Sequence, residues 1–114
     1  MKVLVFGDLP LATEVVKFLT RQKDVNLIGV VLGNKSPKNN DPFKEVPLLA
    51  EYAKEKGLDI FEFDEIDSQW GVNDLDLGLS VRFSKIFKKQ HIDLFKKGII
   101  NFHGGLLPEF GGLY

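Results

Sequence analysis

Short apolar runs alternate with stretches of helical spacing along this chain, and that alternation limits the possible folds more than any other feature. Residues 3–6 form a continuous apolar run that ends at Gly7, as in a strand buried on both faces of a parallel sheet. A helix is expected to follow, because Pro10 suits a first helical turn and apolar residues then recur on one face. The residues of that predicted face are Leu11, Val15, Phe18 and Leu19.

The pattern of strand and helix repeats as far as residue 102. We expect strands over residues 25–32, 59–61, 75–81 and 98–102. We also expect a helix that begins near Val46 and ends at a Gly57 cap, and a short helical connection over residues 86–95. The alternation predicts an α/β fold, a Rossmann-like, doubly wound and mostly parallel sheet with right-handed crossovers. Ligands of such sheets bind beyond the carboxyl ends of the strands.

Composition narrows the class of protein. A length of 114 residues suits a single domain, and a formal charge of -1 provides no basic excess to hold a phosphate backbone, so nucleic acid is not the expected partner. The chain has no cysteine and only two histidines, so no metal site is expected. The apolar start is too short to cross a bilayer or to act as a signal peptide. We therefore expect no membrane partner and a soluble, cytoplasmic protein.

The first turn of the chain argues against a dinucleotide or ATP site. It holds Gly7 alone, without the three glycines that bring a helix N-terminus to a pyrophosphate and without the glycine, lysine and hydroxyl pattern of a P-loop. We interpret Gly7 as the turn that ends a strand. Asp8 is predicted to be a helix cap whose carboxylate accepts hydrogen bonds from the following backbone amides.

The most informative stretch covers residues 101–112, Asn-Phe-His-Gly-Gly-Leu-Leu-Pro-Glu-Phe-Gly-Gly. Asn101 and His103 stand at positions i and i+2 of an expected strand end, so both side chains project to the same side of the sheet. An amide donor and an imidazole suit the stabilisation of an oxyanion and the transfer of a proton. The residues alone leave a second interpretation open, in which both side chains only satisfy backbone groups at the strand end.

Several other polar and aromatic residues are predicted to be structural. His91 is interpreted as a surface or partly buried structural residue, and Trp70 as a cover for the sheet. The three neighbouring carboxylates Asp64, Glu65 and Asp67 are interpreted as solvated charge rather than as metal ligands.

The stretch from Asn101 resembles the Asn-x-His-x-Ser-Leu-Leu-Pro signature of the folate-dependent formyltransferases. The asparagine and histidine of that signature fall on Asn101 and His103, which the resemblance implies are catalytic. Gly105 occupies the usual serine position. The resemblance implies that the folate site is lined there by Gly105, Leu106, Leu107 and Pro108.

An upstream segment, residues 76–87, also resembles the family. In the family the main chain just after this strand pairs with the pterin ring, and by that resemblance the cofactor-binding residues are Lys85, Ile86 and Phe87. By residue type alone, Ile86 and Phe87 are predicted to be core residues, and the resemblance adds a role as pocket wall. Lys85 is predicted to lie on a solvated face.

The resemblance implies a function and a cosubstrate. Residues 1–114 would be the N-terminal part of a formyltransferase catalytic domain that uses 10-formyltetrahydrofolate. The variant Gly-Gly-Leu-Leu-Pro-Glu-Phe-Gly-Gly is most similar to the sugar N-formyltransferases, so the expected acceptor is a nucleotide-linked amino sugar such as a dTDP-4-amino-4,6-dideoxyhexose rather than tRNA. A homodimer is possible for the full-length protein.

Two alternatives to an active enzyme stay open. The family uses a third catalytic residue, an aspartate that follows the histidine by some tens of positions, and nothing in this chain matches it. The chain therefore looks truncated, and we expect little activity from it in isolation. One alternative is an inactive fragment, and the other is a non-catalytic folate-binding or nucleotide-binding module.

Overall fold

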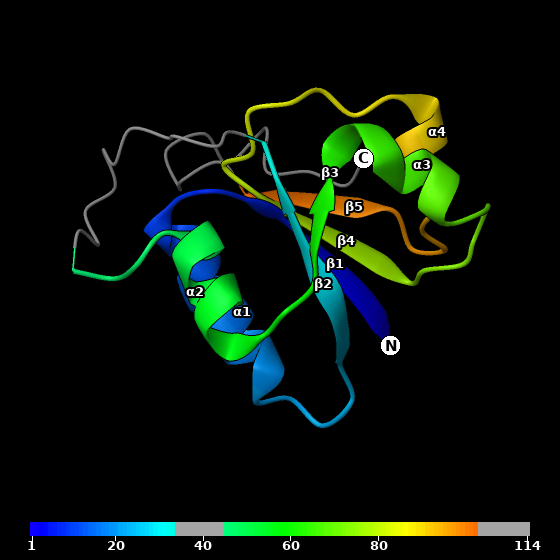
Figure 1. Cartoon of the computed structure of the whole chain (residues 1–114). Helices are drawn as coiled ribbons and strands as arrows, with labels where there is room; N and C mark the ends of the chain where they lie inside the picture. Colours follow the sequence, from blue (N-terminus) through cyan, green and yellow to red (C-terminus); the bar gives the residue numbers. More distant parts are fainter. Residues whose placement is uncertain (34–44, 103–114) are drawn as a thin grey trace.

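A computed structural model describes residues 1–33 and 45–102 of the chain. Within those ranges, five strands form one sheet with the order β3-β2-β1-β4-β5, and every neighbouring pair is parallel (Figure 1). The strands are β1 Lys2–Gly7, β2 Asn26–Leu32, β3 Ile60–Glu62, β4 Leu77–Val81 and β5 Ile99–Phe102. The prediction of a Rossmann-like parallel sheet is confirmed.

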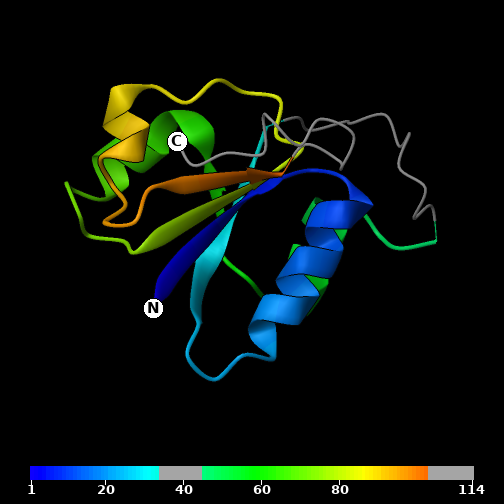
Figure 2. The ribbon, with the colours of Figure 1, turned by 180° about the vertical axis from the view of Figure 1, so that it is seen from behind.

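Helices cover both faces of the sheet. On one face lie α1 Pro10–Thr20 and α2 Leu49–Lys56, side by side in both views (Figures 1 and 2). The other face carries the 3-10 turn η1 Phe63–Glu65, α3 Ile66–Gln69 and α4 Lys89–Ile92. The sheet is therefore doubly wound, as predicted. None of the helices in the described part of the chain is long and apolar enough to cross a membrane.

The predicted helices differ from the observed ones in three ways. Gly57 caps α2 in the left-handed conformation with a φ of 68°, as predicted, but the helix begins at Leu49 and leaves Val46 outside it. The connection predicted over residues 86–95 is helical only within α4. Phe18 is 55% exposed, so its place on the predicted buried face of α1 is wrong, whereas Leu19 is buried and Leu11 and Val15 pack against the core as predicted.

The close approach of α1 to β1 explains the error at Phe18. A Cβ atom placed on Gly7 would lie 2.6 Å from the Cβ of Ala12, so the helix contacts the strand through a small side chain. Successive helical residues turn by about 100°. A buried strip that runs through Ala12, Val16 and Leu19 therefore directs Phe18 away from the sheet.

The core has two parts, one on each face of the sheet. Val3 and Val5 of β1 point toward α1 and α2, whereas Leu4 and Phe6 point toward the opposite face. Phe6 has no exposed surface and lies at the centre of an aromatic cluster. Its ring centroid is 4.9 to 6.4 Å from those of Phe63, Phe83, Phe87 and Phe95, in edge-to-face geometry. We call these five residues the Phe6 cluster.

We predict that Phe6→Ala lowers the free energy of unfolding by about 3–5 kcal/mol, because it removes buried surface and leaves a cavity among rings that cannot collapse into it. Phe18→Ala is the matched control, since it makes the same chemical change at an exposed site and should stay within about 0.5 kcal/mol of the unchanged protein. Urea unfolding followed by Trp70 fluorescence measures both. Equal losses in the two variants would contradict the packing described above.

Candidate active site

Asn101 lies on the same face of the sheet as Phe6. It pairs with Ser80 of β4, and Ser80 pairs with Phe6 of β1, so the three residues form one row across the sheet. Residues paired in register on parallel strands share a face. Asn101 is 9% exposed and Ser80 is 2% exposed. The predicted catalytic amide therefore stands near the carboxyl end of β5, next to the point between β1 and β4 where the strand order reverses.

Asp8 joins the carboxyl ends of β1 and β2. Its Oδ1 accepts a hydrogen bond of 2.9 Å from the backbone N–H of Gly33, and the residue is 5% exposed. The N-cap position of α1 is held by Leu9 rather than by Asp8, so the prediction of Asp8 as the cap residue is wrong. Sequence spacing did not reveal the bond, since it joins residues 25 positions apart.

Gly33 is the point where the segment after β4 comes closest to the end of β2. A Cβ atom on Gly33 would lie 2.8 Å from a ring carbon of Phe83 and 2.8 Å from Oγ of Ser84. It would also lie 3.3 Å from Oδ2 of Asp8. A side chain at this position would therefore displace the side chains of Phe83 or Ser84.

The chain turns sharply as it leaves β4. Arg82 has a φ of 52°, in the left-handed region that residues other than glycine rarely adopt. Its backbone N–H donates to the carbonyl of Phe102, at a distance of 3.2 Å. The turn directs the next residues over the Phe6 cluster, where Phe83 and Phe87 are partly buried. A strained turn held by a neighbouring strand is common beside ligand sites.

The three predicted pterin-binding residues lie in this segment and differ in burial. Phe87 packs on Phe6, as predicted for a core residue. Ile86 is 83% exposed, so its prediction as a core residue is wrong, and Lys85 is exposed as predicted. The segment is anchored at Phe83 and Phe87, and the residues between those anchors project into solvent.

The main chain of this segment offers unused donors. Within the part of the chain that the structure describes, the backbone N–H groups of Lys85 and Ile86 donate to no protein acceptor. Both residues are exposed. A planar ligand with hydrogen-bonding edges could pair with them.

His91 underlies the same segment. It is 6% exposed, and its Nδ1 accepts a hydrogen bond of 2.9 Å from the backbone N–H of Lys88. Its ring centroid lies 4.4 Å from that of Phe63 and 6.4 Å from that of Phe87. Burial lowers the pKa of His91 below its ordinary value, as does the charge of Lys88. The sequence analysis gave it only a structural role, and the spacing of three residues from Lys88 was the available signal for a helix-start acceptor.

Some predicted residues lie outside the described ranges. They are His103, Gly105, Leu106, Leu107 and Pro108.

The remaining residues singled out in the sequence lie in the described ranges. Trp70 packs on Phe61 at 4.8 Å and covers the sheet, as predicted. Asp64, Glu65 and Asp67 are exposed. Among the described residues, no group of three or more histidine, aspartate or glutamate side chains could hold a metal ion.

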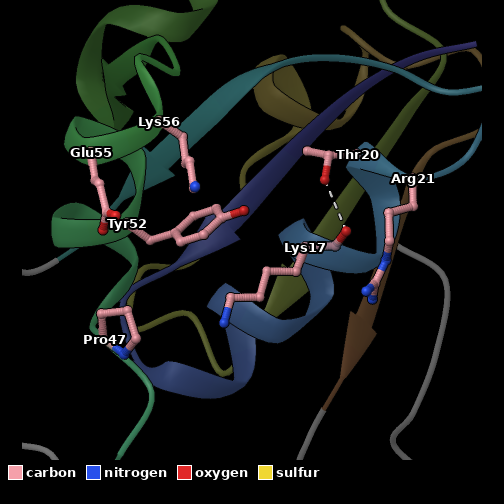
Figure 3. Close-up of a pocket in the computed structure, with 7 residues that line it drawn as sticks. All are labelled: Lys17, Thr20, Arg21, Pro47, Tyr52, Glu55 and Lys56. Atoms are coloured by element: carbon pink, nitrogen blue, oxygen red, sulfur yellow. Dashed lines mark hydrogen bonds between the residues drawn. The ribbon is translucent and has the colours of Figure 1, made fainter.

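A hollow of about 470 Å³ lies between α1 and α2, away from the predicted site (Figure 3). Lys17 and Tyr52 face each other across it, with Nζ 5.6 Å from the ring centroid, and Lys17 also pairs with Glu14 at 3.7 Å. Lys17 and Lys56 stand in the last turns of their helices, where the helix dipole favours cations. The helix dipole thus explains why lysines stand at these positions. No predicted site residue lines the hollow.

Comparison with known proteins identifies the relatives of the chain. The family model described as "Formyl transferase" matches residues 1–114. The chain is 31% identical to the methionyl-tRNA formyltransferase of Borrelia garinii subsp. bavariensis, over 99% of this chain and 36% of that protein. It is 28% identical to that of Ruminiclostridium cellulolyticum, over 98% and 37%. It is 30% identical to that of Elusimicrobium minutum, over 98% and 34%. The chain therefore spans about a third of the length of these relatives.

We predict that Asp8→Ala lowers the free energy of unfolding by about 1.5–3 kcal/mol, because it removes a charged acceptor and leaves the partly buried N–H of Gly33 without this partner. Asp8→Asn is the matched variant, since its amide oxygen can still accept that bond, and it should lose less than half as much. Urea unfolding of both variants measures the difference. Equal losses would mean that the carboxylate charge, rather than the acceptor oxygen, stabilises this edge.

Proposed function

The chain belongs to the formyl transferase family, and we propose that it builds the folate site of an enzyme that formylates the amino group of a nucleotide-linked amino sugar. The family takes its formyl group from 10-formyltetrahydrofolate. Under this proposal, residues 1–114 are the N-terminal part of the catalytic domain. The observation that carries the proposal is the position of Asn101, buried near the carboxyl end of β5 and close to the strand reversal where ligands of such sheets bind.

The proposed chemistry is acyl transfer between two nitrogen atoms. The acceptor amine attacks the formyl carbon, a new C–N bond forms, and the bond from that carbon to N10 of the folate then breaks. The side-chain amide of Asn101 donates to the oxyanion that develops on the formyl oxygen. His103 supports proton transfer from the attacking amine. Its geometry is outside the described residues, so this role rests on the sequence motif alone.

Folate recognition is proposed to rest on main chain rather than on side chains. The exposed segment after β4 has backbone donors at Lys85 and Ile86 that no acceptor within residues 1–33 and 45–102 uses. Phe87, partly buried against Phe6, fixes the end of that segment. Gly105, Leu106, Leu107 and Pro108 are proposed from the sequence motif to bind the folate as well.

Two acceptors are supported by different observations. The sequence variant over residues 104–112 and the formal charge of -1 favour an amino sugar on a nucleotide carrier. The names of the relatives favour a second candidate, the amino group of methionyl-tRNA. Both acceptors offer a primary amine to the same formyl donor, so the proposed folate site is common to them.

We predict saturable binding of a non-hydrolysable analogue of 10-formyltetrahydrofolate, measured by calorimetric titration. Ile86→Pro removes a backbone donor and should weaken binding at least about fivefold, the equivalent of one hydrogen bond. Ile86→Ala is the matched control, because it changes the exposed side chain and keeps the N–H, and it should bind within about twofold of the unchanged chain. A failure of the unchanged, folded chain to bind would overturn the folate proposal. Equal weakening in both variants would place recognition in the side chain.

The acceptor is tested by titrating the analogue-saturated chain with a dTDP-4-amino-4,6-dideoxyhexose and with methionyl-tRNA. We predict saturable binding of the sugar nucleotide that varies little with salt. Binding of tRNA through phosphate contacts would instead weaken steeply as salt rises. Tight tRNA binding at 0.15 M salt (roughly physiological) together with no binding of the sugar nucleotide would favour the second candidate.

A further inference from the structure

His91 lies between the Phe6 cluster and the segment that is proposed to hold folate, residues 85–87. Its ring packs between Phe63, on the η1 side, and Phe87, at the end of that segment. Its Nδ1 accepts the backbone N–H of Lys88, the residue that follows Phe87. One buried side chain therefore contacts the segment through its ring and through a main-chain hydrogen bond.

The hydrogen bond fixes the chemical state of the ring. A nitrogen that accepts an N–H must be unprotonated, so the neutral ring carries its proton on Nε2. Protonation of Nδ1 would turn the acceptor into a donor that faces another donor. The bond to Lys88 therefore exists only while His91 is neutral.

We propose that His91 is a positioning residue of the folate site, whose neutral ring holds the main chain of residues 85–87 in place and whose protonation releases it. The inference rests on the proposed function, since it assigns the segment to folate. His91 is not proposed to contact the folate itself. It acts through Lys88 and Phe87.

The surroundings of His91 set the pH range of the release. Burial has the largest effect and lowers the pKa of His91. Asp67 of α3 raises this pKa, the positive charge of Lys88 lowers it, and Asp64 of η1 raises it. The pKa of the folded protein is therefore below the ordinary value of 6.5, and the ring is neutral at pH 7. Release is expected only as the pH falls below 6.5.

The lowered pKa of His91 also makes the stability of the fold depend on pH. Between the two pKa values the unfolded chain binds a proton at this position that the folded chain does not bind, so stability rises with pH across that interval. The contribution of His91 is complete above pH 6.5 and is lost as the pH falls through the folded pKa. Affinity for folate must therefore be measured where the chain is still folded, as judged by circular dichroism.

Two substitutions distinguish the contribution of the His91 ring from that of its hydrogen-bond acceptor. His91→Phe keeps an aromatic ring against Phe63 and Phe87 but removes the acceptor of the Lys88 N–H. His91→Asn keeps an acceptor oxygen at the same number of bonds from the main chain but removes the ring. Neither replacement titrates between pH 5.5 and 8 (about the range in which histidine changes charge).

The experiment is a titration of the unchanged chain and both variants with the folate analogue. It is repeated at several pH values between about 8 and about 5.5, the range in which a histidine changes charge. We expect the affinity of the unchanged chain to fall toward the acid end, by up to about fivefold once the ring is fully protonated, the equivalent of one hydrogen bond. His91→Phe should be about fivefold weaker throughout and His91→Asn about equal to the unchanged chain at pH 8. Both variants should show flat pH profiles, which also controls for titration of the ligand.

Hydrogen exchange of the Lys88 amide gives a readout without ligand. Protection of that amide should be present in the unchanged chain and in His91→Asn, and lost in His91→Phe. If the unchanged chain binds the analogue and His91→Phe binds equally well, the inference is overturned and the proposed function stands. If the folded, unchanged chain does not bind at any pH, the proposed function fails and the inference fails with it.

Discussion

The burial of Phe6 among four other rings is the interaction on which both the sheet and the candidate site depend. β1 is the strand at which the sheet order reverses, and Phe6 is its last large side chain. The rings that surround it come from η1, from the segment after β4 and from the chain before β5. One apolar cluster thus ties together the parts of the chain that meet at the carboxyl edge.

The candidate site follows from that arrangement. Asn101 and Ser80 share the row of Phe6, so they lie on the face of the sheet that the aromatic cluster covers. The edge-to-face contacts favour fixed ring orientations, which a cluster of aliphatic side chains would not impose. Gly33 and Asp8 close the other side, where β2 ends and the segment after β4 passes over it.

Much of this fold could be predicted from the sequence, because apolar runs of strand length report burial directly. The observed strands begin or end within two residues of the predicted ranges. Errors occurred where an answer depended on contacts distant in sequence. Phe18 faces solvent because Ala12 packs on Gly7, and Ile86 is exposed because its neighbours Phe83 and Phe87 take the buried positions. Of the candidate site, Asn101 was predicted from its motif, whereas the Asp8 bond and the burial of His91 needed the tertiary structure.

A site that binds its ligand through backbone hydrogen bonds depends on the residues that hold that backbone in place. Side chains at exposed positions such as Ile86 can change without altering the backbone donors, so the ligand places little constraint on them. The binding of the ligand instead constrains the buried and partly buried residues that hold this main chain against the sheet. Phe87 supplies packing at that level and His91 supplies a hydrogen bond. Packing depends weakly on pH, but an imidazole acceptor is lost on protonation. The use of a histidine at this buried position therefore gives the overlying segment a dependence on acidity that phenylalanine would not.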